Sequence, residues 1–225
     1  NNGLFLYTGN PGSDWGLAHF KNNVFAQAGG GWVIAFDSLG GAAIGDTSVV
    51  MEGNVYSFTG TSEVIWRAAG ISNPVYGVSQ TEFDRWRANT GFEVGQSRRT
   101  TQTLAQLFVS QPNLDFTPAA GSALIDAGEP LTQANGSGSS STSLLVDQWW
   151  YFMDGWGMSA IGVAGDTIRV GNCNAVQITA INESTGTLTL ASPCVWGDND
   201  PVFWSPGGVT FAGLAPDAGA FEFGA

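Results

Sequence analysis

The sequence has little charge of either sign, and positive charge is its scarcest component. Only 12% of the 225 residues are charged, and 7 Lys and Arg stand against 19 Asp and Glu, which gives a net charge of −12. Nucleic acids and anionic membranes are bound mainly through Lys and Arg. No apolar run approaches the roughly 20 residues of a membrane-spanning helix. We therefore expect no nucleic-acid partner and no membrane insertion.

Disorder is excluded by what the sequence does contain. Hydrophobic residues make up 43% and aromatic residues 12%, including 9 Trp, whereas disordered chains are poor in aromatic residues and rich in charge. The 32 Gly indicate frequent turns. This composition predicts an all-β protein that is secreted, either extracellular or at the cell surface. Because the first residues lack the pattern of a signal peptide, we expect that a signal has been removed or that the chain is a fragment.

Only two cysteines are present, and they flank a predicted β-hairpin. Apolar and polar residues alternate over 176–181 and over 187–190, on either side of a Gly-containing turn. In that pairing Cys173 and Cys194 lie nearly opposite each other, within reach of a disulfide bond. We predict a disulfide, the alternative being two buried thiols, and a disulfide indicates an oxidising compartment.

A loose repeat marks the first 60 residues. Asn23-Val24-Phe25 recurs 31 residues later as Asn54-Val55-Tyr56, and Asn2-Gly3-Leu4-Phe5 lies 21 residues before the first copy. A parallel β-helix turns once per roughly 20 to 30 residues and stacks equivalent positions. The repeat therefore predicts inward Asn side chains that bond along the stack and aromatic rings that pack in the core. The alternative is a chance recurrence of a common triplet.

Helical periodicity is confined to two segments. Residues 81–90 carry apolar side chains three positions apart, with Ser79 or Thr81 as the expected N-cap and Gly91 at the end. Residues 101–108 show a weaker pattern of the same kind. Everywhere else the sequence predicts short strands between turns.

Several segments, in order, resemble one family. They are Phe83–Gly91, Gln96-Ser97, Leu114–Phe116, Gly121–Gly128 and the closing Pro216–Phe223. This set resembles the C-terminal end of secreted right-handed parallel β-helix proteins of the pectate-lyase-like superfamily, which finish on an Asp-x-Gly-Ala-Phe-Glu motif. The resemblance covers most of the chain from Asn23 onward. It implies an architecture and leaves the function open, because the superfamily also contains hydrolases, adhesins and anchored surface proteins.

The predicted architecture is therefore all-β, a right-handed parallel β-helix with an inserted β module. The β-helix covers residues 1–132, has few rungs, is open at its N-terminal edge and contains both short helices. The remaining segments are, in chain order, a flexible Gly/Ser linker at 133–143, a small β-barrel or β-sandwich module at 144–213 and a closing β-helix element at 214–225.

The one histidine and the one lysine lie in the same short segment. In a strand His19 and Lys21 point to the same side, and both face outward if Phe20 faces the interior. A polysaccharide lyase needs such a pair, one group to take a proton beside a carboxylate and one to neutralise that carboxylate. Asp14 would complete the set of predicted catalytic residues. The alternative is an exposed pair without a role, and the net charge of −12 argues against a polyanionic substrate.

Aromatic residues are concentrated in the inserted module. A flat ring on a β surface can stack on a sugar face, although most rings of a small module must form its core. Strand alternation sends one of Trp149 and Trp150 outward, so these two residues, with Trp15, are the predicted carbohydrate-binding residues.

Two further pairs of residues predict a metal site and covalent modification. Asp198 and Asp200 carry the hard oxygen ligands that suit Ca²⁺, the one cofactor that the sequence indicates. A turn without metal is the alternative, since the Gly and the distal Glu of an EF-hand loop are missing. Asn135 and Asn182 each begin an Asn-x-Ser sequon, the acceptor site of N-glycosylation.

Two functions from different classes follow from these patterns. The first is an extracellular carbohydrate-associated protein, either a lyase or glycoside hydrolase that degrades polysaccharides or the glycan-binding part of one, with a polysaccharide or cell-surface glycan as its partner. The second is a non-catalytic structural, adhesive or filament-forming surface subunit. In that case the open edge of the β-helix would stack on another copy or on a partner chain.

Overall fold

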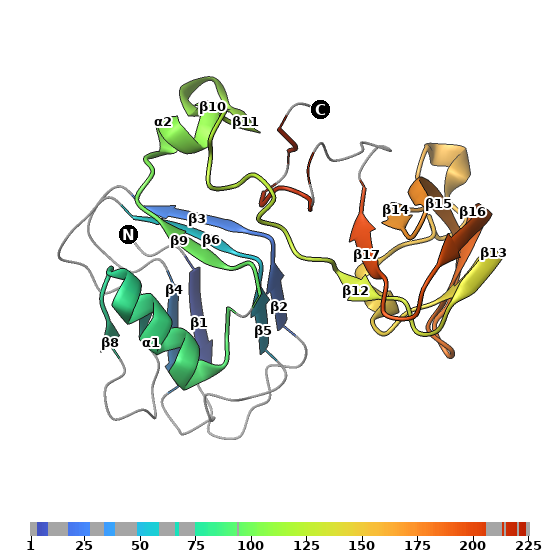
Figure 1. Ribbon diagram of the computed structural model, residues 1–225, viewed down its shortest axis with the longest axis horizontal. Coiled ribbons are helices and arrows are strands. Elements are labelled where there is room, and N and C mark those ends of the chain that lie inside the picture. The colour runs from blue at the N-terminus through green and yellow to red at the C-terminus, as the bar shows by residue number, and fades with distance from the viewer. Residues whose placement is uncertain are drawn as a thin grey trace. The chain divides into compact units, whose positions relative to one another are not determined.

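The chain folds into two compact units. The computed structural model describes residues 4–8, 18–27, 34–38, 49–58, 66–67, 75–93, 95–205, 213, 215–219 and 221–223. Unit 1 comprises Asn1–Glu129 and Ala215–Phe223, and unit 2 comprises Pro130–Leu214 and Gly224–Ala225. Strands predominate in both units (Figure 1), so the prediction of an all-β protein is confirmed. Among the described residues, no helix has the length and apolar character needed to cross a membrane.

Unit 1 is built mainly from strands that pair in parallel with a strand further along the chain. The parallel sheets are β1 (Leu4–Thr8) with β4 (Ile34–Ser38), β2 (Ala18–Lys21) with β5 (Val49–Glu52), and β3 (Val24–Gln27) with β6 (Val55–Phe58) and β9 (Arg98–Thr100). The antiparallel pairs are β7 (Trp66–Arg67) with β8 (Val75–Tyr76), and β10 (Phe108–Ser110) with β11 (Asp115–Pro118). Because parallel neighbours need a long crossover, the chain leaves each of these sheets and returns to it with a later strand.

The register of the parallel sheets follows the Asn repeat. Phe25 of β3 pairs with Tyr56 of β6, as the 31-residue spacing predicts, and the two rings stack with their centroids 5.1 Å apart. The predicted third copy does not join this stack, because Leu4 pairs with Ile34 in a different sheet. Strands β1, β2 and β3 belong to three different sheets. Similar triplets therefore need not lie in the same sheet.

One helix of unit 1 matches its prediction and the other is shorter. Helix α1 spans Gln80–Thr90, begins at the N-cap Ser79 and ends at Gly91, which has φ 72°. Helix α2 spans only Leu104–Leu107, because the chain becomes extended at Phe108. The described 3₁₀ helices are η1 (Gln111–Asn113), η2 (Trp149–Tyr151) and η3 (Ser159–Ile161).

The core of the parallel sheets is aromatic. Tyr56 packs against Phe25, Phe58, Phe83 and Trp86, with ring centroids 5.1 to 6.5 Å apart. Phe83 and Trp86 come from one face of α1 and are fully buried. The aromatic packing that the repeat predicts is present, and α1 supplies two of its rings.

The closing segment, Ala215–Phe223, belongs to unit 1. The Gly128 N–H donates to the Pro216 carbonyl at 2.7 Å, and the Ala218 N–H donates to the Leu124 carbonyl at 2.9 Å. The two segments of unit 1 that flank unit 2 in the sequence are therefore hydrogen-bonded to each other.

Unit 2 is one curled antiparallel sheet of six strands in the order β12-β17-β14-β15-β16-β13. The strands are β12 (Thr132–Gln133), β13 (Gly138–Leu145), β14 (Thr167–Val170), β15 (Cys173–Asn182), β16 (Thr187–Trp196) and β17 (Pro201–Trp204). A bridge between Ala134 and Val146 joins its two edges, so the sheet closes on itself. Its interior is filled by buried apolar side chains such as Ile168, Ile178 and Leu188.

The predicted hairpin and disulfide of unit 2 are both confirmed. Strands β15 and β16 pair with Asn182 opposite Thr187. Cys173 and Cys194 form a disulfide with their Cα atoms 5.7 Å apart. A register shift between Ile178 and Ala180 moves the pairing by one residue toward the open end of the hairpin.

The predicted flexible linker at 133–143 was wrong. Gly138–Leu145 form strand β13, which pairs with β16. Most of its Ser and Thr side chains face solvent, while Leu144 is buried. A strand with one polar face can have the same composition as a linker. Strand β16, whose pairing orders β13, lies far away in the sequence.

Candidate functional site

The predicted catalytic pair lies on β2 beside a carboxylate of β5. Lys21 Nζ forms an ion pair with Glu52 Oε2 at 2.9 Å, because the parallel register places these residues side by side. Burial and then the Lys21 ammonium lower the pKa of His19, while the Glu52 carboxylate raises it. His19 and Lys21 are partly buried instead of fully outward, and the lysine charge is already neutralised.

Two residues predicted to act near this pair, Asp14 and Trp15, lie outside the described residues. Among the described residues, the acid beside Lys21 is Glu52. A cross-strand partner 31 residues away can be found from the repeat only when the register of the two strands is known.

A column of polar side chains follows the ends of β2 and β5. The backbone and side-chain N–H groups of Asn23 donate to Asn54 Oδ1 at 2.9 and 3.0 Å. The Asn54 backbone N–H donates to Ser97 Oγ at 3.3 Å, and its side chain donates to the Phe20 carbonyl at 2.8 Å. The predicted hydrogen bonding between Asn side chains is confirmed for Asn23 and Asn54, and Ser97 continues the column before β9.

Glu93, which the sequence did not single out, lies beside this column and is fully buried. Asn54 Nδ2 donates to both of its carboxylate oxygens, at 3.0 and 3.1 Å, and the Tyr56 hydroxyl donates to one of them. Its backbone has φ 56°, and its N–H donates to the Met51 carbonyl at 2.7 Å. A buried carboxyl group needs such hydrogen-bond partners, since burying an unpaired polar group is costly.

Burial changes the protonation of this group. It raises the pKa of Glu93 to about 7, although the hydrogen bonds to the carboxylate lower it in part. Burial, and secondarily the Glu93 charge, raise the pKa of Tyr56. In the sequence, Glu93 stands between Phe92 and Val94, and this apolar context is the one signal of burial that could have been used.

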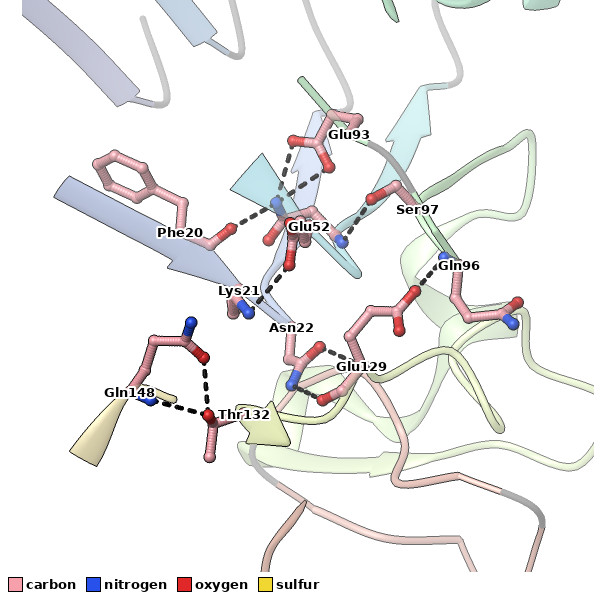
Figure 2. A network of polar contacts seen from close by, with 11 residues as sticks. Phe20, Lys21, Asn22, Glu52, Glu93, Gln96, Ser97, Glu129, Thr132 and Gln148 are labelled. Atoms are coloured by element: carbon pink, nitrogen blue, oxygen red, sulfur yellow. Dashed lines mark hydrogen bonds and ion pairs between the residues drawn. The ribbon is translucent and has the colours of Figure 1, made fainter. Parts of the chain in front are cut away.

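Asn22 fastens the last residue of the first segment of unit 1. Its Oδ1 accepts from the Glu129 N–H at 2.7 Å, and its Nδ2 donates to the Glu129 carbonyl at 2.9 Å (Figure 2). The Glu129 carboxylate accepts from the Gln96 N–H. Gly53 at this corner has φ 65°, and a Cβ there would lie 2.3 Å from Asn22 Oδ1.

Three acidic residues hold the closing segment in place. The N–H groups of Asp126 and Phe223 donate to Asp217 at 2.8 and 2.7 Å, and the Asp217 N–H donates to Glu222 at 3.0 Å. Burial raises the pKa of Glu222 to about 7, and the carboxylates of Asp217 and Asp126 add to this. The acids of the closing motif therefore accept backbone hydrogen bonds, which is a structural role.

A loop of unit 2, residues 153–166, is closed at its base by two carboxylates. The Met153 N–H donates to Asp166 Oδ2 at 2.8 Å, and the Asp166 N–H donates to the Met153 carbonyl at 2.9 Å. Asp154 accepts from the Trp156 N–H at 2.9 Å and from the Ile181 N–H of β15 at 3.1 Å. The base of the loop is thus tied to the barrel.

The loop and the strand next to it expose large apolar side chains. Trp156 is 68% exposed and has φ 47°, and Trp204 of β17 is 47% exposed. Trp204 Nε1 donates to Asp166 Oδ1 at 3.0 Å, so the carboxylate at the loop base also holds this ring. Met158 and Ile161 of the same loop are exposed as well. The sequence did not single out Trp156 or Trp204 as binding residues.

The predicted sugar-stacking pair divides between core and surface. Trp150 is 45% exposed, whereas Trp149 packs against the barrel core. One ring of the pair points outward, as expected, but the residues lie in η2 and not in a strand. A turn of 3₁₀ helix, not strand alternation, separates the two rings.

The predicted calcium ligands shape a turn. The Gly136 N–H donates to Asp198 and the Gly197 N–H donates to Asp200, both at 2.7 Å. In the part of the chain that the structure describes, no group of three His, Cys, Asp or Glu side chains could hold a metal ion. These contacts favour the turn alternative, and calcium binding stays a prediction.

Both predicted glycosylation acceptors are exposed on unit 2. Asn135 Nδ2 donates to Asp147 Oδ1 at 3.1 Å, and Asn182 Oδ1 accepts from the Ser184 hydroxyl at 2.7 Å. Exposure is one requirement for attachment of a sugar, and glycosylation itself stays a prediction.

Comparison of the chain with protein-family models, with curated proteins and with solved structures finds no match. The structure brings Lys21 together with Glu52, and the Asn column together with Glu93. Separately, the Trp156 backbone N–H donates to Asp154 and the Trp204 indole N–H donates to Asp166, two carboxylates of one loop.

Proposed function

We propose that the chain is an extracellular glycan-binding protein in which unit 2 carries the binding site. The observation that carries the proposal is that Trp156 and Trp204 are 68% and 47% exposed, while the Trp156 backbone N–H donates to Asp154 and the Trp204 indole N–H donates to Asp166. An exposed ring whose orientation is held by a hydrogen bond, as that of Trp204 is, forms a ready surface for the apolar C–H face of a sugar.

The backbone at Trp156 supports a functional role for this loop. A left-handed conformation in a residue other than glycine costs about 1–2 kcal/mol, and Trp156 has φ 47°. Such strain persists where surrounding contacts enforce it, and it is concentrated at binding sites. Here the Trp156 backbone N–H donates to Asp154 Oδ1 at 2.9 Å, while the ring is exposed to solvent.

For unit 1 we propose a right-handed parallel β-helix that serves as the scaffold. The parallel pairing of β2 with β5 and of β3 with β6 and β9 supports this fold, as does the column from Asn23 to Ser97. The handedness follows the strong preference of parallel crossovers for the right-handed form.

The extracellular location is supported by the disulfide Cys173–Cys194, since disulfides persist in oxidising compartments. The ion pair of Lys21 with Glu52 favours binding over β-elimination, because a lyase needs an uncommitted cation to neutralise the substrate carboxylate.

The proposal is tested by affinity electrophoresis of the full chain in gels that contain different polysaccharides. We expect retardation by at least one polysaccharide, and its loss in Trp156→Ala and Trp204→Ala. Val195→Ala, which removes an equally exposed apolar side chain from β16, is the matched control and should migrate like the wild type. Unretarded wild-type protein in a broad panel of glycans would reject the proposal.

The second function, a structural subunit that assembles through a β-helix edge, is favoured by one observation. Within the described residues, β3 has β6 as its only neighbour in the sheet and leaves its other edge open. Open edges of parallel strands pair readily with another chain. Light scattering separates the two functions, because this subunit would show concentration-dependent growth in mass without any glycan.

A further inference from the structure

The hydrogen bond between Trp204 and Asp166 restricts what the ring can recognise. Trp204 Nε1 donates to Asp166 Oδ1 at 3.0 Å, so the one polar group of the indole is already engaged. The neighbouring residues of β17, Val202 and Phe203, are buried. The ring therefore offers its apolar surface to a ligand and no hydrogen-bond donor.

Asp166 is itself fixed from a second side. Its Oδ2 accepts from the Met153 N–H at 2.8 Å, and Gly165 before it packs so closely that a Cβ would lie 1.9 Å from the Ile178 carbonyl oxygen. One carboxylate thus joins the base of the loop to the ring of Trp204. If this bond is lost, the ring is free to leave its orientation while the barrel core is untouched.

The charge around the loop argues against an acidic ligand. Unit 2 contains six acidic residues and a single cation, Arg169, which gives it a net charge of −5. Asp154 and Asp166 are two of those acids, and both lie at the base of the loop that carries Trp156. A polyuronate or a sulfated glycan would bring its own negative charge within a Debye length of these carboxylates, and Arg169, which pairs with Phe203 next to Trp204, is the single cation of unit 2 that could offset the repulsion.

We propose that the loop 153–166 and Trp204 bind an uncharged polysaccharide by stacking, and that Asp166 is the positioning residue that orients Trp204. This inference rests on the proposed glycan-binding function. It adds the class of ligand and assigns a role to a carboxylate that would otherwise be taken for a surface acid.

The ligand class is tested by affinity electrophoresis of the full chain with two groups of polymers. Hydroxyethylcellulose and galactomannan represent uncharged polysaccharides, and polygalacturonate and alginate represent charged ones. We expect retardation by an uncharged polymer, with an affinity that changes less than about twofold between about 0.02 and 0.5 M salt. Binding to the charged polymers alone would overturn this inference and leave the proposed function standing, whereas binding to neither group would reject both.

The role of Asp166 is tested by a double-mutant cycle with Trp204. We expect Trp204→Ala to weaken binding about tenfold or more and Asp166→Asn to weaken it several-fold, because an amide can accept only one of the two hydrogen bonds that Asp166 accepts. In the Trp204→Ala background, Asp166→Asn should have no further effect.

Two measurements keep a loss of folding apart from a loss of positioning. The variants should retain the wild-type thermal transition of unit 2 within a few degrees, and Trp204→Phe, which keeps a ring but cannot donate to Asp166, should become insensitive to Asp166→Asn. Additive effects of Asp166→Asn and Trp204→Ala would show that Asp166 acts independently of the ring and would overturn its assignment.

Discussion

At the scale of single residues, Glu93 couples the stability of unit 1 to pH. Its carboxyl group is fully buried, and its pKa is raised from the ordinary 4.5 to about 7 by burial. Between these values the folded state retains a proton that the unfolded state has lost, so the free energy of unfolding falls as the pH rises. This contribution to the free energy of unfolding is fully present below about pH 4.5 and is lost as the pH rises through 7. The total change is about 3 kcal/mol.

The variant Glu93→Gln should therefore gain stability relative to the wild type as the pH is raised from 4.5 to 8. A neutral amide imitates the protonated acid and has no proton to lose. The measurement is the guanidinium denaturation midpoint at several pH values, with Glu183→Gln in the exposed hairpin turn as the control. A difference between variant and wild type that stays constant across this range would contradict the prediction.

Gly53 illustrates a second effect at this scale, the lack of space for a side chain. Gly53→Ala and Gly91→Ala both place alanine at a positive φ, at 65° and 72°, but only at Gly53 does the new Cβ meet an atom, Asn22 Oδ1 at 2.3 Å. We expect Gly91→Ala to cost about 1 kcal/mol, and Gly53→Ala about 2 kcal/mol more, because it displaces the two hydrogen bonds of Asn22 to Glu129. Equal destabilisation, measured by chemical denaturation, would show that the contact is relieved without loss.

At the scale of elements, local patterns were sufficient where one segment defines its own pairing. The hairpin of β15 and β16 and its disulfide follow from alternation around a turn, and the Asn23–Asn54 column follows from a repeat. Strand β13 was missed because its order depends on pairing with β16, some 50 residues later in the sequence. Glu93 and the ring of Trp204 were missed for the same reason, since burial and exposure are decided by residues that the sequence places far away.

The disulfide should be a main support of unit 2. It closes a segment with a sequence separation of 21, for which loop-closure entropy predicts a stabilisation of about 3 kcal/mol. Reduction should lower the melting temperature of unit 2 by roughly 10–20 °C. Because both cysteines of the chain lie in unit 2, the transition of unit 1 serves as the internal control in scanning calorimetry. An unchanged unit 2 transition after complete reduction would contradict this expectation.

At the scale of the whole molecule, unit 1 is formed from two separate segments of the sequence. All of unit 2 except Gly224–Ala225 lies between these two segments in the sequence. The two segments meet at the hydrogen bond between Gly128 and Pro216, and the closing segment is fixed further by Asp217. The closing element could be predicted from its motif, whereas the boundary at Pro130 could not, because the first residues of the barrel have the composition of a linker.

Replacement of residues 130–214 by a linker of about four residues should leave unit 1 folded. The ends to be joined are already held close by the Gly128–Pro216 bond. The shortened protein should unfold cooperatively and should be destabilised by Gly53→Ala to the same extent as the full chain. A molten or aggregated product, judged by near-ultraviolet circular dichroism, would show that unit 1 depends on unit 2.

The column from Asn23 through Asn54 to Ser97 also has a mechanical consequence. Its hydrogen bonds run from one strand to the next, in the same direction as the backbone bonds of the parallel sheets. A pulling force in that direction would break the hydrogen bonds between two strands one after another. Each polar side chain of the column adds one more bond to that sequence. A force along the strands would instead load all the bonds of a pair at once in shear. Unit 1 should therefore be mechanically anisotropic, weaker when peeled than when sheared.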